Sequence, residues 1–134
     1  LIEIGKLVYP KAKLDVRDFE EKKFTKKFDW VFFSGFTNRG CNYLLIKDIM
    51  TEMFRICKKG LAMNFVGGNI DFKSKDLFYS DPEKIYSLSK SFSNRITLRH
   101  DYFPYEFTVY VYKDNRHTKN NIFTEYVKNT RNVV

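Results

Sequence analysis

The sequence predicts an α/β fold with a mixed sheet, in which a parallel centre is followed by an antiparallel pair of strands. The apolar run Trp30 to Phe33 ends in Ser34-Gly35, a helical stripe follows, and a second apolar run covers 61–66. Strand, helix and strand in this order form a βαβ unit. Further on, the segments 95–99 and 107–112 are joined by a short link that contains proline, which favours antiparallel pairing.

The amino-terminal part is predicted to hold a helix and a strand. Apolar residues at positions 1, 2, 4, 7 and 8 form a helical stripe, which Tyr9-Pro10 ends. Residues 12–19 alternate as in a short strand, and a charged segment, 20–27, follows. The next run, Trp30 to Phe33, is continuously apolar, which is typical of a strand that is covered on both faces.

A long helix is predicted before the second apolar run. Asn42 is expected to cap it, because an asparagine oxygen can accept a hydrogen bond from a free backbone N–H of the first turn. Cations are expected in the last turn, where they suit the helix dipole, and Gly60 is expected in the left-handed closing position. The apolar stripe consists of Leu45, Ile46, Ile49, Met50, Met53, Phe54 and Cys57, and the cations are Arg55, Lys58 and Lys59.

The second half begins with the strand 61–66, which ends at Gly67-Gly68, and a long loop over 69–80 is expected to follow. Asp81-Pro82 is a helix start, since the aspartate can act as N-cap and proline suits the first helical position. Ile85, Leu88 and Phe92 are expected on the inner face of this helix. Beyond the two antiparallel strands, residues 114–134 are predicted to be a polar tail.

Composition narrows the class of protein. The chain has 134 residues, which fits one domain, and a formal net charge of +8. The two cysteines do not make a disulfide framework, so we expect Cys57 to be a buried free thiol in a reducing, cytoplasmic compartment. Two histidines and no Cys/His cluster predict no metal site, and no apolar run is long enough to span a bilayer.

Four segments together resemble the carboxyl-terminal two-thirds of a class I S-adenosylmethionine-dependent methyltransferase. Residues 12–19 resemble the third strand with its terminal acid, and 28–36 resemble the fourth strand with its Ser-Gly loop. Residues 43–65 resemble the following helix and fifth strand, and 98–113 resemble the closing antiparallel strands. The resemblance implies a Rossmann-like sheet over 1–113 and a transferase that uses S-adenosylmethionine as its cofactor.

The resemblance also implies cofactor contacts. Asp18 would accept a hydrogen bond from the adenine amino group, with the Phe19 backbone N–H facing a ring nitrogen. Ser34, Gly35 and Phe36 would pass beside the methionine and ribose part, where a glycine lets the backbone approach a ligand closely. The alternatives are a capping or loop aspartate at position 18 and a plain strand-to-loop turn at 34–35.

The family's glycine-rich turn has no counterpart in the 134 residues. Because the chain begins at Leu1 within a helical pattern, we expect a truncated domain that binds S-adenosylmethionine poorly. Lys13 to Asp18 and Trp30 to Phe33 would then lack their usual neighbours and expose two strand edges. We expect these edges to pair with each other in a contracted sheet; the alternative is pairing between copies of the chain, in a homo-oligomer.

His100 and Tyr102 are candidates for substrate contact, where either could help to deprotonate or orient the methyl acceptor. The alternative is a structural role, since the run 99–102 can pair internally. Methyl transfer depends largely on positioning, so a dedicated base is not required. The acceptor is unknown. Two other functions stay open: a non-enzymatic scaffold or interaction module of the same fold, and a basic module that binds nucleic acid.

Overall fold

The computed structural model describes residues 1–16, 24–35 and 40–114. Asp18, Phe19, Phe36 and residues 115–134 therefore lie outside the described part. The elements are α1 (Ile2–Val8), β1 (Phe28–Phe33), α2 (Tyr43–Ile56), β2 (Cys57–Val66), α3 (Pro82–Lys90), β3 (Ile96–Phe103) and β4 (Glu106–Tyr112).

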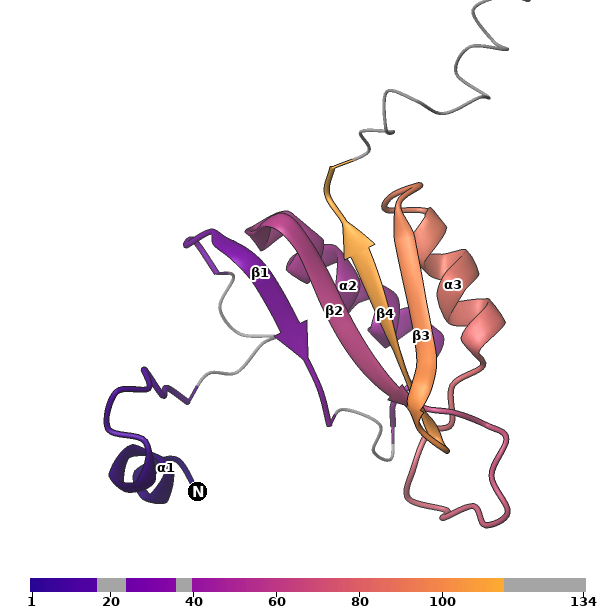
Figure 1. Ribbon diagram of the computed structural model, residues 1–134, viewed down its shortest axis with the longest axis horizontal. Coiled ribbons are helices and arrows are strands. Elements are labelled where there is room, and N and C mark those ends of the chain that lie inside the picture. Colours follow the sequence, from indigo (N-terminus) through magenta and orange to yellow (C-terminus); the bar gives the residue numbers. More distant parts are fainter. Residues whose placement is uncertain (17–23, 36–39, 115–134) are drawn as a thin grey trace, which may run out of the picture.

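The four strands form one sheet in the order β1-β2-β4-β3 (Figure 1). β1 pairs with β2 in parallel, and β4 pairs antiparallel with both β2 and β3. β1, β2 and β3 therefore run in one direction, and β4 lies between β2 and β3 and runs in the opposite direction. The predicted α/β class, the parallel contact between the two apolar runs and the antiparallel carboxyl-terminal pair are confirmed.

The helices α2 and α3 lie on the same side of the sheet, behind it in Figure 1. Every second residue of β4 is buried against them, which is the alternation expected of a strand with one covered face, while β2 is buried without interruption from Gly60 to Met63. The core is made of Ile46, Ile49, Met50 and Met53 from α2, Leu61, Met63 and Phe65 from β2, Ile85 from α3, and Phe107, Val109 and Val111 from β4, with Cys41 beside them.

Neither α2 nor α3 covers the opposite face of the sheet, which we call the open face (Figure 1). Phe32 of β1 is 71% exposed there, while its neighbours Val31 and Phe33 pack against the core. The expectation that this strand is covered on both faces is therefore wrong for the described part of the chain. A continuous apolar run cannot by itself distinguish one covered face from two.

The boundary between α2 and β2 differs from the prediction. α2 ends at Ile56 and β2 begins at Cys57, so Lys58, Lys59 and Gly60 are strand residues rather than a helix end. Pairing with β1 extends β2 backwards, because Gly60 is in register with Trp30 and the Lys59 ammonium lies 3.1 Å from the Asp29 carboxylate. Gly60 does not have a positive φ, so the predicted left-handed closing position is also wrong.

The predicted strand over 12–19 is not formed in its described part, 12–16. The contracted sheet expected from it is likewise absent there, and β1 is an edge strand among the described strands. Alternation over so few residues carries little free energy when no neighbouring strand offers hydrogen bonds. The predicted amino-terminal helix is confirmed as α1, although none of its residues is buried.

Both predicted helix caps are confirmed. The Asn42 side chain accepts a hydrogen bond of 2.9 Å from the Leu45 backbone N–H, and Asp81 accepts one of 2.8 Å from Glu83. The caps satisfy donors that have no partner within the helix. The two caps also mark the first turns of α2 and α3, the helices that follow β1 and β2 in the chain.

Candidate functional site

Ser34-Gly35 lies where β1 ends, beside the last residues of the parallel strand β2. Gly35 has φ +79°, in the region that L side chains rarely adopt, and a Cβ at this position would meet nothing within 4 Å. The backbone conformation, and not crowding, thus accounts for glycine here. No atom of the described residues occupies the space beside this backbone, at the edge where parallel sheets bind ligands.

A chain of hydrogen bonds joins this turn to the carboxyl-terminal strands. The Ser34 hydroxyl lies 3.4 Å from Oδ1 of Asn64 on β2, and Nδ2 of Asn64 donates to the Tyr102 hydroxyl at 2.9 Å and to Glu106 at 3.0 Å. The Tyr102 hydroxyl also lies 2.7 Å from the Thr108 hydroxyl. We call these five residues the Asn64 network. It connects two residues that the sequence singled out separately, Ser34 and Tyr102.

Asn64 is a candidate site residue that sequence reasoning did not single out. It is half-buried on the open face of β2, within the otherwise apolar run 61–66. A polar residue inside the run 61–66 was the available signal, since amide groups enter such strands only where they find partners. Its side chain positions both the Ser34 turn and the Tyr102 hydroxyl.

His100 lies on the other face. Its ring is 5.8 Å from the ring of Phe107, which belongs to the core beneath the helices. The register of β3 and β4 shifts between Arg99 and Phe103, and such an irregularity changes the face to which side chains point. Two residues only two positions apart are thereby separated, and His100 does not join Tyr102 in one site.

The predicted internal pairing in this run is present. The Arg99 guanidinium lies 2.7 Å from the Asp101 carboxylate, and this hydrogen bond raises the pKa of Arg99 above its ordinary value. Both side chains are more than half exposed. The pair is thus a surface contact that orders the start of the irregular segment of β3.

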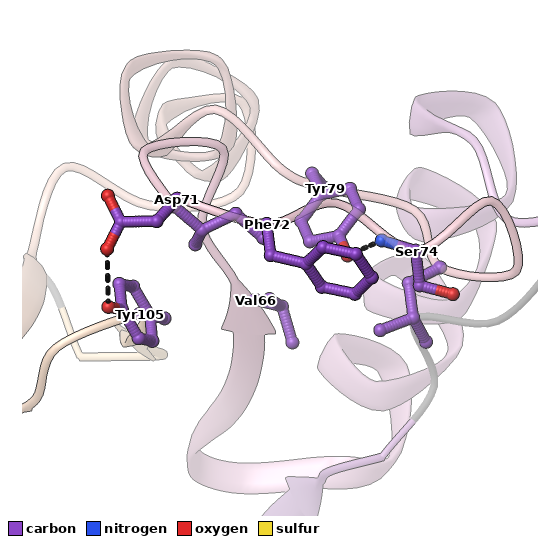
Figure 2. A pocket seen from close by; sticks show the side chains of 8 residues that line it. Val66, Asp71, Phe72, Ser74, Tyr79 and Tyr105 are labelled. Atoms are coloured by element: carbon purple, nitrogen blue, oxygen red, sulfur yellow. Dashed lines mark hydrogen bonds between the residues drawn. The ribbon is translucent and has the colours of Figure 1, made fainter.

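A cavity of about 360 Å³ opens at the carboxyl end of β2 (Figure 2). The Tyr105 hydroxyl donates to the Asp71 carboxylate at 3.2 Å, and the Ser74 backbone N–H donates to the Tyr79 hydroxyl at 2.7 Å. Most of the surface that lines the cavity is apolar. The described lining residues are Val66, Ile70, Asp71, Phe72, Ser74, Leu77, Tyr79 and Tyr105.

No family model, curated protein or solved structure matches this chain. Among the residues that the structure describes, no three His, Cys, Asp or Glu side chains are grouped as metal ligands would be. In the same part of the chain, no helix has the length and apolar character needed to cross a membrane. The predicted adenine contacts of Asp18 and Phe19, and that of Phe36, lie outside the described residues.

Proposed function

We propose that this chain forms part of an enzyme that transfers a methyl group from S-adenosylmethionine to an acceptor. The observation that carries the proposal is the Ser34-Gly35 turn. It combines a left-handed glycine, open space beside the backbone, and a position at the carboxyl edge of two parallel strands. These are the properties expected of a backbone segment that passes close to a bound cofactor.

The arrangement of the strands supports the same proposal. The resemblance implies a parallel-centred sheet that closes with an antiparallel pair. The parallel pairing of β1 with β2 and the antiparallel pairing of β3 with β4 agree with that expectation. The crossover helices α2 and α3 join successive strands of the parallel set. Agreement in strand direction supports the methyltransferase type of sheet.

The chain's own residues would act by positioning. Asn64 holds the Ser34 turn against β2 and, through Tyr102, ties it to β3. When bound, S-adenosylmethionine supplies a methyl group activated by its sulfonium centre. Displacement on such a group depends on alignment of the acceptor, so a rigid hydrogen-bonded edge is the contribution that this chain can make.

The proposal is tested by following the backbone amide signals of the ¹⁵N-labelled chain while S-adenosylmethionine is added. We expect Gly35 and Asn64 to shift, with a dissociation constant weaker than about 100 μM, since no glycine-rich turn is present to hold the methionine end. Absence of any shift at Gly35 and Asn64 would contradict the function and favour the non-enzymatic scaffold. A micromolar or tighter constant would contradict the predicted weak binding.

A matched pair of variants makes the test specific. Gly35 and Gly40 both have positive φ, and a Cβ at either position would meet no atom of the described residues within 4 Å. Gly35→Ala and Gly40→Ala therefore introduce similar backbone strain, but only the first would place a methyl group against the cofactor. We expect Gly35→Ala to reduce the response and Gly40→Ala to retain it. Equal loss in both would assign the effect to strain alone.

A second candidate function is binding of single-stranded nucleic acid on the open face. The guanidinium of Arg95 lies 4.4 Å from the ring centre of Tyr112, and the indole of Trp30 packs edge-on against the same tyrosine, 5.6 Å away. Stacked aromatic and cationic side chains are the usual platform for unpaired bases. A steep fall of oligonucleotide affinity with salt would favour this candidate, and affinity that is absent at low salt would remove it.

A further inference from the structure

The cavity at the end of β2 lies next to the Asn64 network. Val66 lines the cavity and lies two residues beyond Asn64, so their side chains share the open face about 7 Å apart along the strand. In the sheet, Asn64 is opposite Thr108 and Val66 is opposite Glu106, both members of the network. A molecule in the cavity would therefore lie next to the edge that carries Ser34 and Gly35.

The cavity is held by main-chain hydrogen bonds at both ends of its loop. The Gly67 N–H donates to the Tyr105 carbonyl at 2.7 Å, which fixes the β3–β4 turn over the end of β2. The Ser80 N–H donates to the Val66 carbonyl at 2.8 Å, which returns the loop to the same strand. A cavity framed in this way needs little ordering when it binds a ligand.

The lining indicates the chemistry of the occupant. The rings of Phe72, Tyr79 and Tyr105 line the cavity together with Asp71, and Figure 2 shows the Asp71 carboxylate directed at the Tyr105 hydroxyl. Phe72 is 79% exposed, so a flat apolar molecule would bury a ring that now faces solvent. Asp71 accepts one hydrogen bond, from Tyr105, and a carboxylate can accept several, so it can take another from a ligand.

Charge around the cavity favours a neutral occupant. Between Gly67 and Ser80 the loop carries Asp71 and Asp76 against Lys73 and Lys75, which sum to no net charge. The Lys73 ammonium already lies 5.7 Å from the ring centre of Tyr79 and would repel a second cation there. A volume of about 360 Å³ suits a molecule of one or two rings.

We infer that this cavity binds a small, neutral, planar aromatic molecule that donates a hydrogen bond to Asp71. We infer further that the methyl acceptor is a molecule of this class. The second half of the inference rests on the proposed function. The first half, ligand binding by the cavity, stands on the geometry of residues 66–79 and Tyr105.

The test uses indole as the probe, because it has two rings and one N–H donor, and benzofuran as the isostere without the donor. Amide signals of the ¹⁵N-labelled chain are followed as each is added. We expect indole to shift the signals of residues 70–79 and Tyr105, and benzofuran to bind about fivefold or more weakly. No localised shift with indole up to about 5 mM would overturn the inference.

Variants identify the groups responsible. Asp71→Ala is expected to lower indole affinity to that of benzofuran, and Phe72→Ala to weaken both probes. Phe32→Ala is the matched control, since Phe32 is a comparably exposed phenylalanine, 71% against 79%, at another place on the sheet. Equal weakening by Phe32→Ala would overturn the assignment to the cavity.

The two proposals fail separately. Indole binding in the cavity without any response of Gly35 to S-adenosylmethionine would remove the acceptor role and support the ligand site alone. A response of Gly35 to S-adenosylmethionine without indole binding would overturn the cavity inference and support the proposed function.

Discussion

The indole of Trp30 on β1 lies directly against Gly60 on β2. A Cβ at position 60 would be 2.7 Å from Cζ3 of Trp30 and 2.8 Å from the carbonyl oxygen of Val111 on β4. Both distances are too short for a Cβ unless the neighbouring atoms move. The missing side chain at this position therefore allows the indole to lie across the sheet and reach Tyr112 on β4.

Gly60→Ala is predicted to lower the free energy of unfolding by about 1–3 kcal/mol, the usual cost of overpacking. One of the two clashes is with backbone, which cannot rotate away, so relaxation is limited. Urea unfolding followed by tryptophan fluorescence measures the change. Gly68→Ala is the control, because a Cβ there meets nothing within 4 Å, and it should change stability little. A Gly60→Ala variant as stable as the parent would contradict the packing described.

Asn42→Ala is predicted to destabilise the chain by about 1 kcal/mol, because the Leu45 N–H would lose its acceptor at the start of α2. Asn42→Asp retains an acceptor and adds a negative charge that suits the helix amino terminus, so it should be neutral or stabilising. Thermal unfolding by circular dichroism distinguishes the two. Equal destabilisation by both substitutions would show that the capping hydrogen bond does not account for the stability contributed by Asn42.

Cys57 gives the stability a pH dependence. Burial raises the pKa of its thiol above the ordinary value, although the nearby charges of Lys113 and Lys27 act in the opposite sense. The folded chain thus keeps the thiol proton at a pH where the unfolded chain releases it. The contribution to stability is complete below the unfolded pKa, roughly 8.5, and is lost as the pH rises through the higher folded value.

We therefore expect the free energy of unfolding to decrease more steeply above about pH 8.5 in the parent than in Cys57→Ala. Urea unfolding at a series of pH values measures both slopes. Cys41, whose thiol pKa is also raised by burial, is present in both proteins and cancels in the comparison. Parallel curves for the two proteins would contradict the assignment to Cys57.

The outer edge of β1 is predicted to support self-association. Among the described strands β1 has one neighbour, and it carries Phe32 at 71% exposure next to that edge. Sedimentation velocity over a range of concentrations should show a dimer that Phe32→Lys weakens. Phe72→Lys, which adds the same charge at another exposed phenylalanine, should not weaken it. A monomer at about 100 μM would contradict the prediction.

Sequence patterns located most of the elements because each carried a local signal. Asn42 and Asp81-Pro82 marked helix starts, and both caps are present as hydrogen bonds. The alternation over 107–112 matched β4 closely. The same reasoning failed at 58–60, where two lysines and a glycine resemble a helix end but belong to β2, whose Gly60 pairs with Trp30 of β1. Local propensity was overridden there by a neighbour about 30 residues away.

The candidate site was predicted only in part. Ser34-Gly35 was found because a small pair after an apolar run marks a strand end, and its location is confirmed. Asn64 was missed because its hydrogen bonds depend on partners in β3, in β4 and in the turn that follows β1. His100 and Tyr102 are equivalent candidates in the sequence, and the register shift in β3 separates them.

The sequence by itself determined the types of the main elements, their order and the strand end at Ser34-Gly35, since caps, periodicity and turn residues act within a few positions. Only the tertiary structure decided that β4 lies between β2 and β3, that one face of the sheet is left open by α2 and α3, and that Asn64 joins Ser34 to Tyr102. The reason is physical: strand order, face and register are set by burial and hydrogen bonding between segments far apart in the chain, which no local pattern encodes.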